Sequence, residues 1–236
     1  MVMALTWSMS PAHAIEGGAL ARASDRLARA TVAVGTLVQP DDSLRLSRCS
    51  GVLIAPDLVL TAAHCIRGNP VEAVVGLYQG SKRIASVHRV ASAARHAFGP
   101  GSLASHDLVD VLDQISLDVA VLRLETPVRG RSPSRLADLS WGIPSTLQLA
   151  GVGLSGRVGG SLRTATLRPL AITETGLIIA RTIGARVCVG DSGGPVVIPG
   201  RGGPRLVGVA SAVITSRAPC GNILMIAPAS ITVSQF

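Results

Sequence analysis

The chain has 236 residues and a formal net charge of +8, which suffices for one large domain or two smaller domains that share an interface. Its cations are dispersed arginines, with Lys82 the only lysine, and aromatic residues make up only 2% of the sequence. Nucleic-acid binding therefore lacks both a basic stripe and stacking platforms for bases. The composition favours a soluble protein whose cationic surface attracts acidic partners weakly.

Four cysteines lie in two separated zones, Cys49 with Cys65 and Cys188 with Cys220. None of them forms a Cys-x-x-Cys pair, which argues against a structural zinc site. Two disulfides formed in an oxidising compartment explain the pattern better, although three pairings are possible on arithmetic alone. We expect no metal and no cofactor.

The first 14 residues resemble a secretion signal in part. An apolar stretch over 2–9 precedes Ala12-His13-Ala14, whose small first and third residues suit signal peptidase. The segment is short and lacks a basic beginning, so either the start codon is misassigned or the chain is truncated. We expect a signal peptide over 1–14, a mature terminus at Ile15 and a secreted or periplasmic protein. No later stretch is long enough to span a bilayer.

Short β-branched runs punctuated by Gly, Pro and Asp predict an all-β chain. The predicted strands, in chain order, are 30–37, 49–54, 58–61, 71–78, 83–91, 115–122, 145–151, 163–172, 205–213 and 220–226. Residues 127–134 are rich in Pro, Arg and Ser and predict a connector between two halves.

Two segments resemble ligand sites and are interpreted otherwise. Residues 96–113 contain two histidines and three aspartates, but their spacing matches no EF-hand or His-x-x-x-His motif, so we expect a solvated loop. Residues 151–156 match G-x-G-x-x-G, with Glu174 at the distance of a ribose-binding acid. Glycines and β-branched residues follow in place of the required helix, which predicts a hairpin turn and not a dinucleotide site.

Ser192 is a candidate nucleophile because it stands between an acid and two glycines, where the backbone can turn sharply. A serine needs a nearby base, and His64 at the end of the predicted strand 58–61 is the candidate. A bridge between Cys49 and Cys65 would fix where His64 points and would contribute roughly 3 kcal/mol. Asp118 lies in an apolar run, where a carboxylate needs a partner such as a histidine Nδ1–H.

The serine motif also fits the G-x-S-x-G of α/β-hydrolases. That fold places its acid and its histidine after the serine. Residues 193–236 contain no Asp, Glu or His, which excludes this esterase alternative.

Five motifs resemble those of the trypsin/chymotrypsin-like serine proteases (peptidase family S1) and span nearly the whole chain: Ile15–Gly18, Thr61–Cys65, Asp118–Leu122, Gly190–Pro195 and Leu206–Ser211. The resemblance implies one protease domain over 15–236. Its implied fold is two antiparallel six-stranded β-barrels, about 30–126 and about 135–232, with the active site in the cleft between them.

The same resemblance implies a secreted serine endopeptidase that acts through an acyl-enzyme. His64 would take the proton of Ser192, and Asp118 would hold the imidazole. The backbone N–H groups of Gly190 and Ser192 would form the oxyanion hole. The alternative is a protease-fold binding protein that has weak catalysis or none.

Two further features are implied by the family. The free amine of Ile15 would pair with Asp191, and because Ala14 precedes Ile15 we expect signal peptidase itself to expose that amine. Cys188 and Cys220 resemble the bridge that braces the family's specificity pocket.

Arg186, six residues before the serine, stands where the family has the floor of this pocket, and Ser211, Ala212 and Val213 would form its wall. An arginine at the floor repels Lys or Arg at the P1 position of a substrate, and Val213 narrows the mouth, so we expect small or acidic P1 residues. The implied partners are protein or peptide substrates and proteinaceous inhibitors, with no specific nucleic acid and no membrane. We expect the protein to be a monomer.

Overall fold

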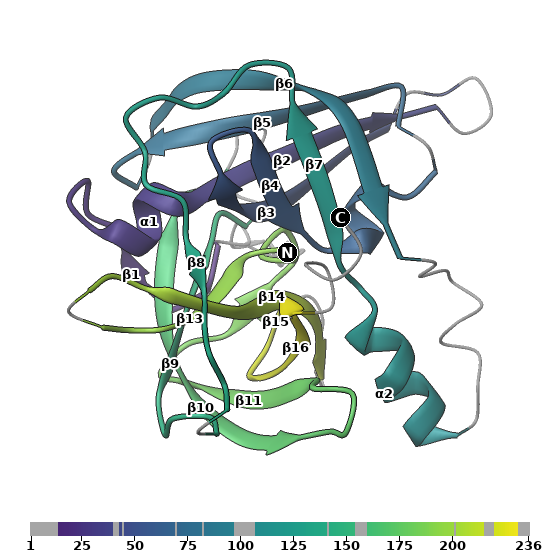
Figure 1. Cartoon of the computed structure of the whole chain (residues 1–236), viewed down its shortest axis with the longest axis vertical. Helices are drawn as coiled ribbons and strands as arrows, with labels where there is room; N and C mark the ends of the chain where they lie inside the picture. The colour runs from purple at the N-terminus through teal and green to yellow at the C-terminus, as the bar shows by residue number, and fades with distance from the viewer. Residues whose placement is uncertain are drawn as a thin grey trace, which may run out of the picture.

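The computed structural model describes residues 14–39, 43, 45–68, 70–81, 83–96, 107–140, 142–153, 160–200, 202–214 and 220–230. Two β-barrels lie one above the other in Figure 1. The first contains the N-terminal half of the strands and the second the C-terminal half, as the sequence predicts for an all-β chain with a connector in its middle.

The first barrel closes in the order β2-β3-β4-β7-β6-β5, and every pairing is antiparallel. Its inward positions are mostly Val and Leu at every second residue, the alternation expected of a sheet with one buried face. The strands are β2 (Thr31–Val38), β3 (Arg45–Ala55), β4 (Leu58–Thr61), β5 (Glu72–Gln79), β6 (Arg83–Arg95) and β7 (Ala120–Leu124).

The second barrel follows the order β10-β11-β16-β14-β13-β9, and β9 pairs back with β10 to close it. All six pairings are antiparallel, so the predicted fold of two six-stranded barrels is confirmed. The strands are β9 (Leu147–Gly151), β10 (Arg163–Ile172), β11 (Ile178–Ile183), β13 (Pro195–Ile198), β14 (Arg205–Ile214) and β16 (Ile223–Pro228).

Shorter elements surround the barrels. Strand β1 (Ala19–Leu20) pairs with β10, β8 (Arg135–Leu136) lies parallel to β14, and β12 (Val187–Cys188) pairs with β15 (Cys220–Gly221). The helical segments are α1 (Arg26–Ala30), the 3-10 helix η1 (Ala63–Ile66) and α2 (Leu108–Ser116). Among the described residues, no helix has the length and hydropathy needed to cross a membrane.

The segment before Asp118 departs from the prediction, because α2 occupies residues for which a loop and the start of a strand were expected. Asp107 caps this helix by accepting a hydrogen bond from the amide of Val109 at 2.8 Å, and Asp110 lies in its first turn. Acidic side chains at both positions are stabilised by the positive end of the helix dipole. The apolar residues of 108–115 recur at helical spacing, a signal that the acidic residues obscured. His106 lies outside the described residues.

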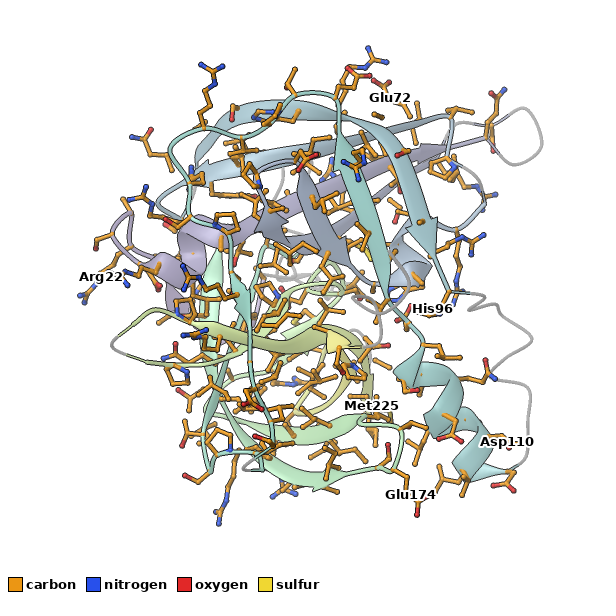
Figure 2. The ribbon with its side chains drawn as sticks, in the orientation of Figure 1. Arg22, Glu72, His96, Asp110, Glu174 and Met225 are labelled. Atoms are coloured by element: carbon orange, nitrogen blue, oxygen red, sulfur yellow. A yellow bond between two sulfur atoms is a disulfide. The ribbon has the colours of Figure 1, made fainter. Side chains whose placement is uncertain are left out.

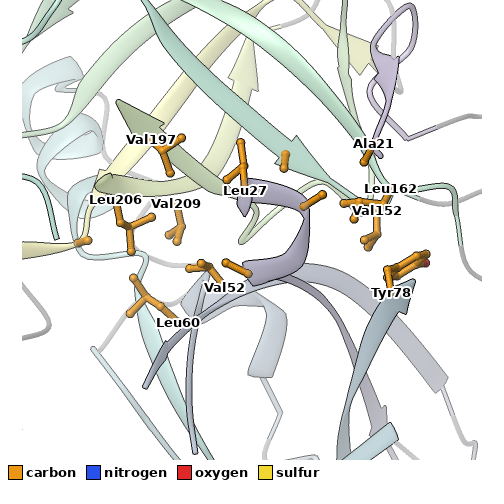
Figure 3. Close-up of a cluster of buried hydrophobic side chains, with 14 of the residues drawn as sticks. Ala21, Leu27, Val52, Leu60, Tyr78, Val152, Leu162, Val197, Leu206 and Val209 are labelled. Carbon is orange, nitrogen blue, oxygen red and sulfur yellow. The ribbon is translucent and has the colours of Figure 1, made fainter. Parts of the chain in front are cut away.

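A cluster of buried apolar side chains joins the two barrels (Figure 3). Val52, Leu60 and Tyr78 come from the first barrel, whereas Val197 and Val209 come from the second. Burying each large side chain contributes roughly 1.5–3 kcal/mol, so this cluster holds the barrels in a fixed relation. Residues from different barrels can therefore form one site.

Both predicted disulfides are present: Cys49–Cys65, with its Cα atoms 6.1 Å apart, and Cys188–Cys220, with its Cα atoms 4.1 Å apart.

The charged side chains labelled in Figure 2, among them Arg22, Glu72 and Glu174, lie at the periphery. Glu174 is thus an exposed residue, while residues 154–156 of the G-x-G-x-x-G segment lie outside the described residues.

Candidate active site

Strand pairing brings His64 and Asp118 together. Strands β4 and β7 are antiparallel neighbours with Thr61 opposite Ala120, so the residues just after β4 and just before β7 meet at one end of the barrel. Asp118 Oδ2 lies 2.7 Å from His64 Nδ1, and Asp118 Oδ1 accepts a hydrogen bond from the backbone N–H of His64 at 2.8 Å. One carboxylate therefore fixes both the backbone and the ring of the histidine.

Asp118 is fully buried, which by itself would raise its pKa. Hydrogen bonds from His64 and from the Ser211 hydroxyl, which donates to Oδ2 at 2.5 Å, outweigh burial and hold the pKa of Asp118 below its usual range. An ionised carboxylate accepts only, so Nδ1 of His64 carries the proton and Nε2 keeps its lone pair. The histidine is thereby set up to accept a proton at Nε2.

Ser192 belongs to the second barrel, in the turn between β12 and β13. It lines the same pocket as His64, with a volume of about 290 Å³. The turn requires glycine at two positions, since φ is +91° at Gly190 and +79° at Gly193. A Cβ at Gly193 would lie 2.2 Å from the hydroxyl oxygen of Thr61. Any other residue there would push the serine turn away from the first barrel.

The backbone of this turn leaves two amides open. The N–H groups of Asp191, Gly193 and Gly194 donate to backbone carbonyls, whereas those of Gly190 and Ser192 find no acceptor within the described ranges. Open amides beside a nucleophile can bind a developing oxyanion.

Ser50, on β3, is a site residue that the sequence analysis missed. Its hydroxyl donates to the Gly190 carbonyl at 2.9 Å and accepts from the Val152 amide at 2.9 Å, and its backbone N–H donates to the Ser192 carbonyl at 2.7 Å. Ser50 thus clamps the serine turn against the first barrel. It sits next to Cys49 but in no recognisable motif, so only tertiary structure reveals this role.

The nitrogen of Ile15 lies 2.9 Å from Asp191 Oδ2, which also accepts a hydrogen bond from the Cys188 amide at 2.8 Å. Ile15 is joined to Ala14 here, so this nitrogen is a neutral amide, and both residues are fully buried. Burial raises the pKa of Asp191 to about 7, although amides of Cys188, Ile15 and Gly153 lower it in part. Asp191 Oδ1 is buried without a hydrogen-bond partner in the described part of the chain.

Ile15 is also strained. Its φ is +30°, the only positive value at a non-glycine residue that the structure describes. A β-branched residue rarely adopts this conformation. The Ala14–Ile15 segment therefore combines a strained backbone with a buried carboxyl group that has no counter-charge among the described residues.

The pocket beside His64 and Ser192 is mostly apolar. Ser211 and Val213 line it as the sequence analysis expected, but Ala212 does not. The remaining lining residues are Val187, Cys188, Val189, Ala210 and Leu224.

Arg186 is not part of this lining, contrary to the expectation that it forms the floor. Its guanidinium turns toward a neighbouring cavity, where Nη2 donates to the Cys220 carbonyl at 2.6 Å and Nη1 lies 3.5 Å from a carboxylate oxygen of Glu16. Its backbone N–H donates to the Glu16 carbonyl at 2.8 Å. Sequence position alone does not show which way a long side chain turns, and the acceptor at Cys220 decides it here.

Among the residues that the structure describes, two groups of potential metal ligands lie close together, one around His64 with Cys49 and Cys65, the other around Glu16 with Cys188 and Cys220. All four sulfur atoms are in disulfides and offer no thiolate. Neither group has the ligand set that a zinc site needs.

Comparisons with solved structures find the same architecture. HL collagenase superposes with a TM-score of 0.73 at 23% identity, covering 93% of this chain and 96% of that one. A scabies mite inactivated protease paralogue, S-I1, gives a TM-score of 0.69 at 22% identity and the same coverage. These similarities concern the fold.

Sequence comparisons give relatives and a family. Kallikrein-1E2 of Equus caballus is 30% identical over 174 residues, covering 65% of this chain and 66% of the kallikrein. Trypsin iota of Drosophila melanogaster is 28% identical, and the match covers 69% of this chain and 67% of trypsin iota. The chain thus matches about two thirds of the length of these curated relatives. A sequence model of the Trypsin family matches residues 30–232, and the chain belongs to that family.

Proposed function

We propose that this protein is a secreted serine endopeptidase in which His64, Asp118 and Ser192 form the catalytic triad. The observation that carries the proposal is the double contact of buried Asp118 with His64, in a pocket that His64 shares with Ser192. Secretion is supported by the two disulfides, which form in oxidising compartments.

In the proposed reaction, Ser192 Oγ attacks a peptide carbonyl while His64 Nε2 takes its proton. The resulting imidazolium is stabilised by Asp118, and the oxyanion is bound by the amides of Gly190 and Ser192. His64 then protonates the leaving amine as the C–N bond breaks. In the second half of the reaction, His64 takes a proton from a water that attacks the acyl-enzyme and returns it to Ser192 Oγ, which releases the carboxylic acid product.

The pocket supports an apolar P1 residue of modest size. Its wall is formed by Val187, Val189, Val213 and Leu224, and apart from His64 its described lining contains no acidic or basic side chain. A Lys or Arg at P1 would be buried there without a counter-charge, which is costly. Because Arg186 turns away, the basis for an acidic P1 residue is lost as well. Val, Ala and Leu are the P1 residues we propose.

Cleavage between Ala14 and Ile15 is the proposed maturation step. A free Ile15 amine would be cationic next to Asp191, which now lacks a counter-charge. The cut would also release the strained backbone at Ile15. Both changes favour the inserted terminus after cleavage.

The direct test uses protein that begins at Ile15, with Ser192→Ala as the matched control. We expect a fluorophosphonate probe to label the unaltered protein and not the variant, and a P1-varied peptide library to show fastest cleavage after Val, Ala or Leu. Fastest cleavage after Lys or Arg would refute the pocket assignment. Absence of both labelling and cleavage would refute the enzyme assignment and favour the protease-fold binding protein.

A further inference from the structure

A second cavity, of about 360 Å³, lies away from the catalytic residues and is rich in arginine. Its wall includes Arg26 from α1, Arg135 from β8 and Arg205 from β14, together with the segments 132–134 and 202–204. Figure 1 shows α1, β8 and the start of β14 on the left of the view, whereas α2, which leads into Asp118, lies on the right. None of these arginines contributes to the proposed catalysis.

Two of the arginines are forced together by the sheet. Strands β8 and β14 run parallel with Arg135 directly beside Arg205 and Leu136 beside Leu206. Residues at paired positions point to the same face of a sheet, and Leu206 is buried on the opposite face. The two cations therefore face solvent side by side, an arrangement that destabilises a sheet unless something neutralises it.

In the described part of the chain, no acidic side chain forms an ion pair with these arginines. The described lining of the cavity contains neither Asp nor Glu, and none of the three guanidinium groups has an ion-pair partner within the described ranges. The acidic residues nearest in sequence are occupied elsewhere: Asp25 accepts hydrogen bonds from the first amides of α1, and Asp138 accepts one from the Ser140 amide.

The wall of the cavity also leaves room for the guanidinium of Arg26, the third cation. Gly203 has φ +105°, and a Cβ there would lie 3.3 Å from Arg26 Nη1, so the missing side chain leaves room for this guanidinium. Ser134 lies in the same wall, 4% exposed, and its hydroxyl has no hydrogen-bond partner among the described residues. Three uncompensated cations and an unsatisfied hydroxyl thus surround one cavity.

We propose that this cavity, the Arg26–Arg135–Arg205 site, binds a compact oxyanion, a phosphate or sulfate group. Guanidinium groups form paired N–H···O contacts that match the oxygens of phosphate and sulfate. A bound anion would also offset the repulsion among the three guanidinium cations. The volume admits the free anion or the same group carried on a small sugar. Such a ligand would bind independently of substrate and would link α1, β8 and β14.

The test titrates inorganic phosphate into the Ser192→Ala protein by calorimetry, with ionic strength held constant by NaCl. We expect saturable binding that weakens about tenfold in Arg135→Gln or Arg205→Gln and disappears in the double variant. Arg168→Gln, which removes an equal charge from an exposed position on β10 outside the cavity, is the matched control and should bind as the parent does.

A stability measurement keeps the test decisive. In phosphate-free buffer Arg135→Gln should unfold at a higher temperature than the parent, because it removes the like-charge pair, and saturating phosphate should abolish this difference. Inorganic sulfate compared with a sulfated disaccharide then distinguishes the source: tighter binding of the disaccharide indicates a sugar-borne group, and equal affinity indicates the free anion. The proposal is overturned if phosphate binding does not saturate, or if Arg168→Gln weakens it as much as Arg135→Gln does.

Discussion

Cleavage at Ile15 should remove the loss of stability that Asp191 causes as the pH rises toward 7. With the Ala14–Ile15 bond intact, burial raises the pKa of Asp191 to about 7, far above the usual carboxyl value of 3.8. The folded state then holds a proton that the unfolded state releases. The stabilising contribution is complete below pH 3.8 and is lost as pH rises through about 7.

The magnitude follows from that gap. A difference of this size between folded and unfolded pKa corresponds to roughly 4 kcal/mol. After cleavage, the Ile15 ammonium beside Asp191 favours the ionised carboxylate, so the pKa of Asp191 falls. The contribution of this group then no longer declines between pH 4 and 7.

The assay is urea unfolding between pH 4 and 8 of two proteins, one starting at Ile15 and one with residues 12–14 retained, both carrying Ser192→Ala to prevent self-digestion. We expect the extended protein to lose stability relative to the cut one by several kcal/mol across this range, at about 1.4 kcal/mol per pH unit in the steepest part. Asp191→Asn in both backgrounds should make the two curves parallel. Parallel curves with Asp191 intact would show that the buried carboxyl does not respond to the new amine, and the reasoning would fail.

Three further outcomes follow from the contacts of the site. Asp118→Asn should lower kcat by about 10⁴-fold, because the carboxylate no longer holds the imidazole in the tautomer with the proton on Nδ1. Ser211→Ala removes one of several hydrogen bonds to Asp118 and should lower kcat only about tenfold. Equal losses of kcat in steady-state kinetics would contradict the assigned roles. Ser50→Ala leaves the Gly190 carbonyl buried without its partner and should lower the free energy of unfolding by about 2 kcal/mol as well as kcat, whereas the exposed Ser47→Ala, on the same strand, should change neither. Arg186→Ala should leave the P1 preference unchanged, and a new preference for Lys or Arg would place this side chain back in the pocket.

The sequence allowed the fold and the chemical centre to be predicted to different depths. Glycine-flanked Ser192, His64 at a strand end and Asp118 in an apolar run are short motifs whose residue types carry their own meaning. The strands of the first barrel and most of those of the second followed from β-branched runs. Strands β11 and β13 were missed. Residues 178–183 form an apolar run bounded by Gly176 and Gly184, a strand signal that was overlooked, and residues 195–198 directly continue the serine motif.

Contacts between distant segments could not be predicted in this way. Ser50 reaches Gly190 across the interface of the barrels, 140 residues away in the chain, and nothing local marks that serine. Arg186 occupies a position whose meaning depends on a rotamer, and the carbonyl of Cys220 selects that rotamer. The adjacency of Arg135 and Arg205 arises from a two-residue strand too short to be read from sequence.

The division of the site between the barrels has a consequence for control. The proposed proton acceptor His64 and its carboxylate Asp118 belong to the first barrel, whereas the proposed nucleophile and the Ser211 hydroxyl that donates to Asp118 belong to the second. The buried apolar cluster between the barrels is the joint. In the proposed mechanism, turnover can proceed only while that joint is closed. Heat, a substitution or an inhibitor that separates the barrels by about an ångström would stop the proposed hydrolysis while each barrel is still folded, so the reaction rate would report on docking before any spectroscopic probe of strand content changes.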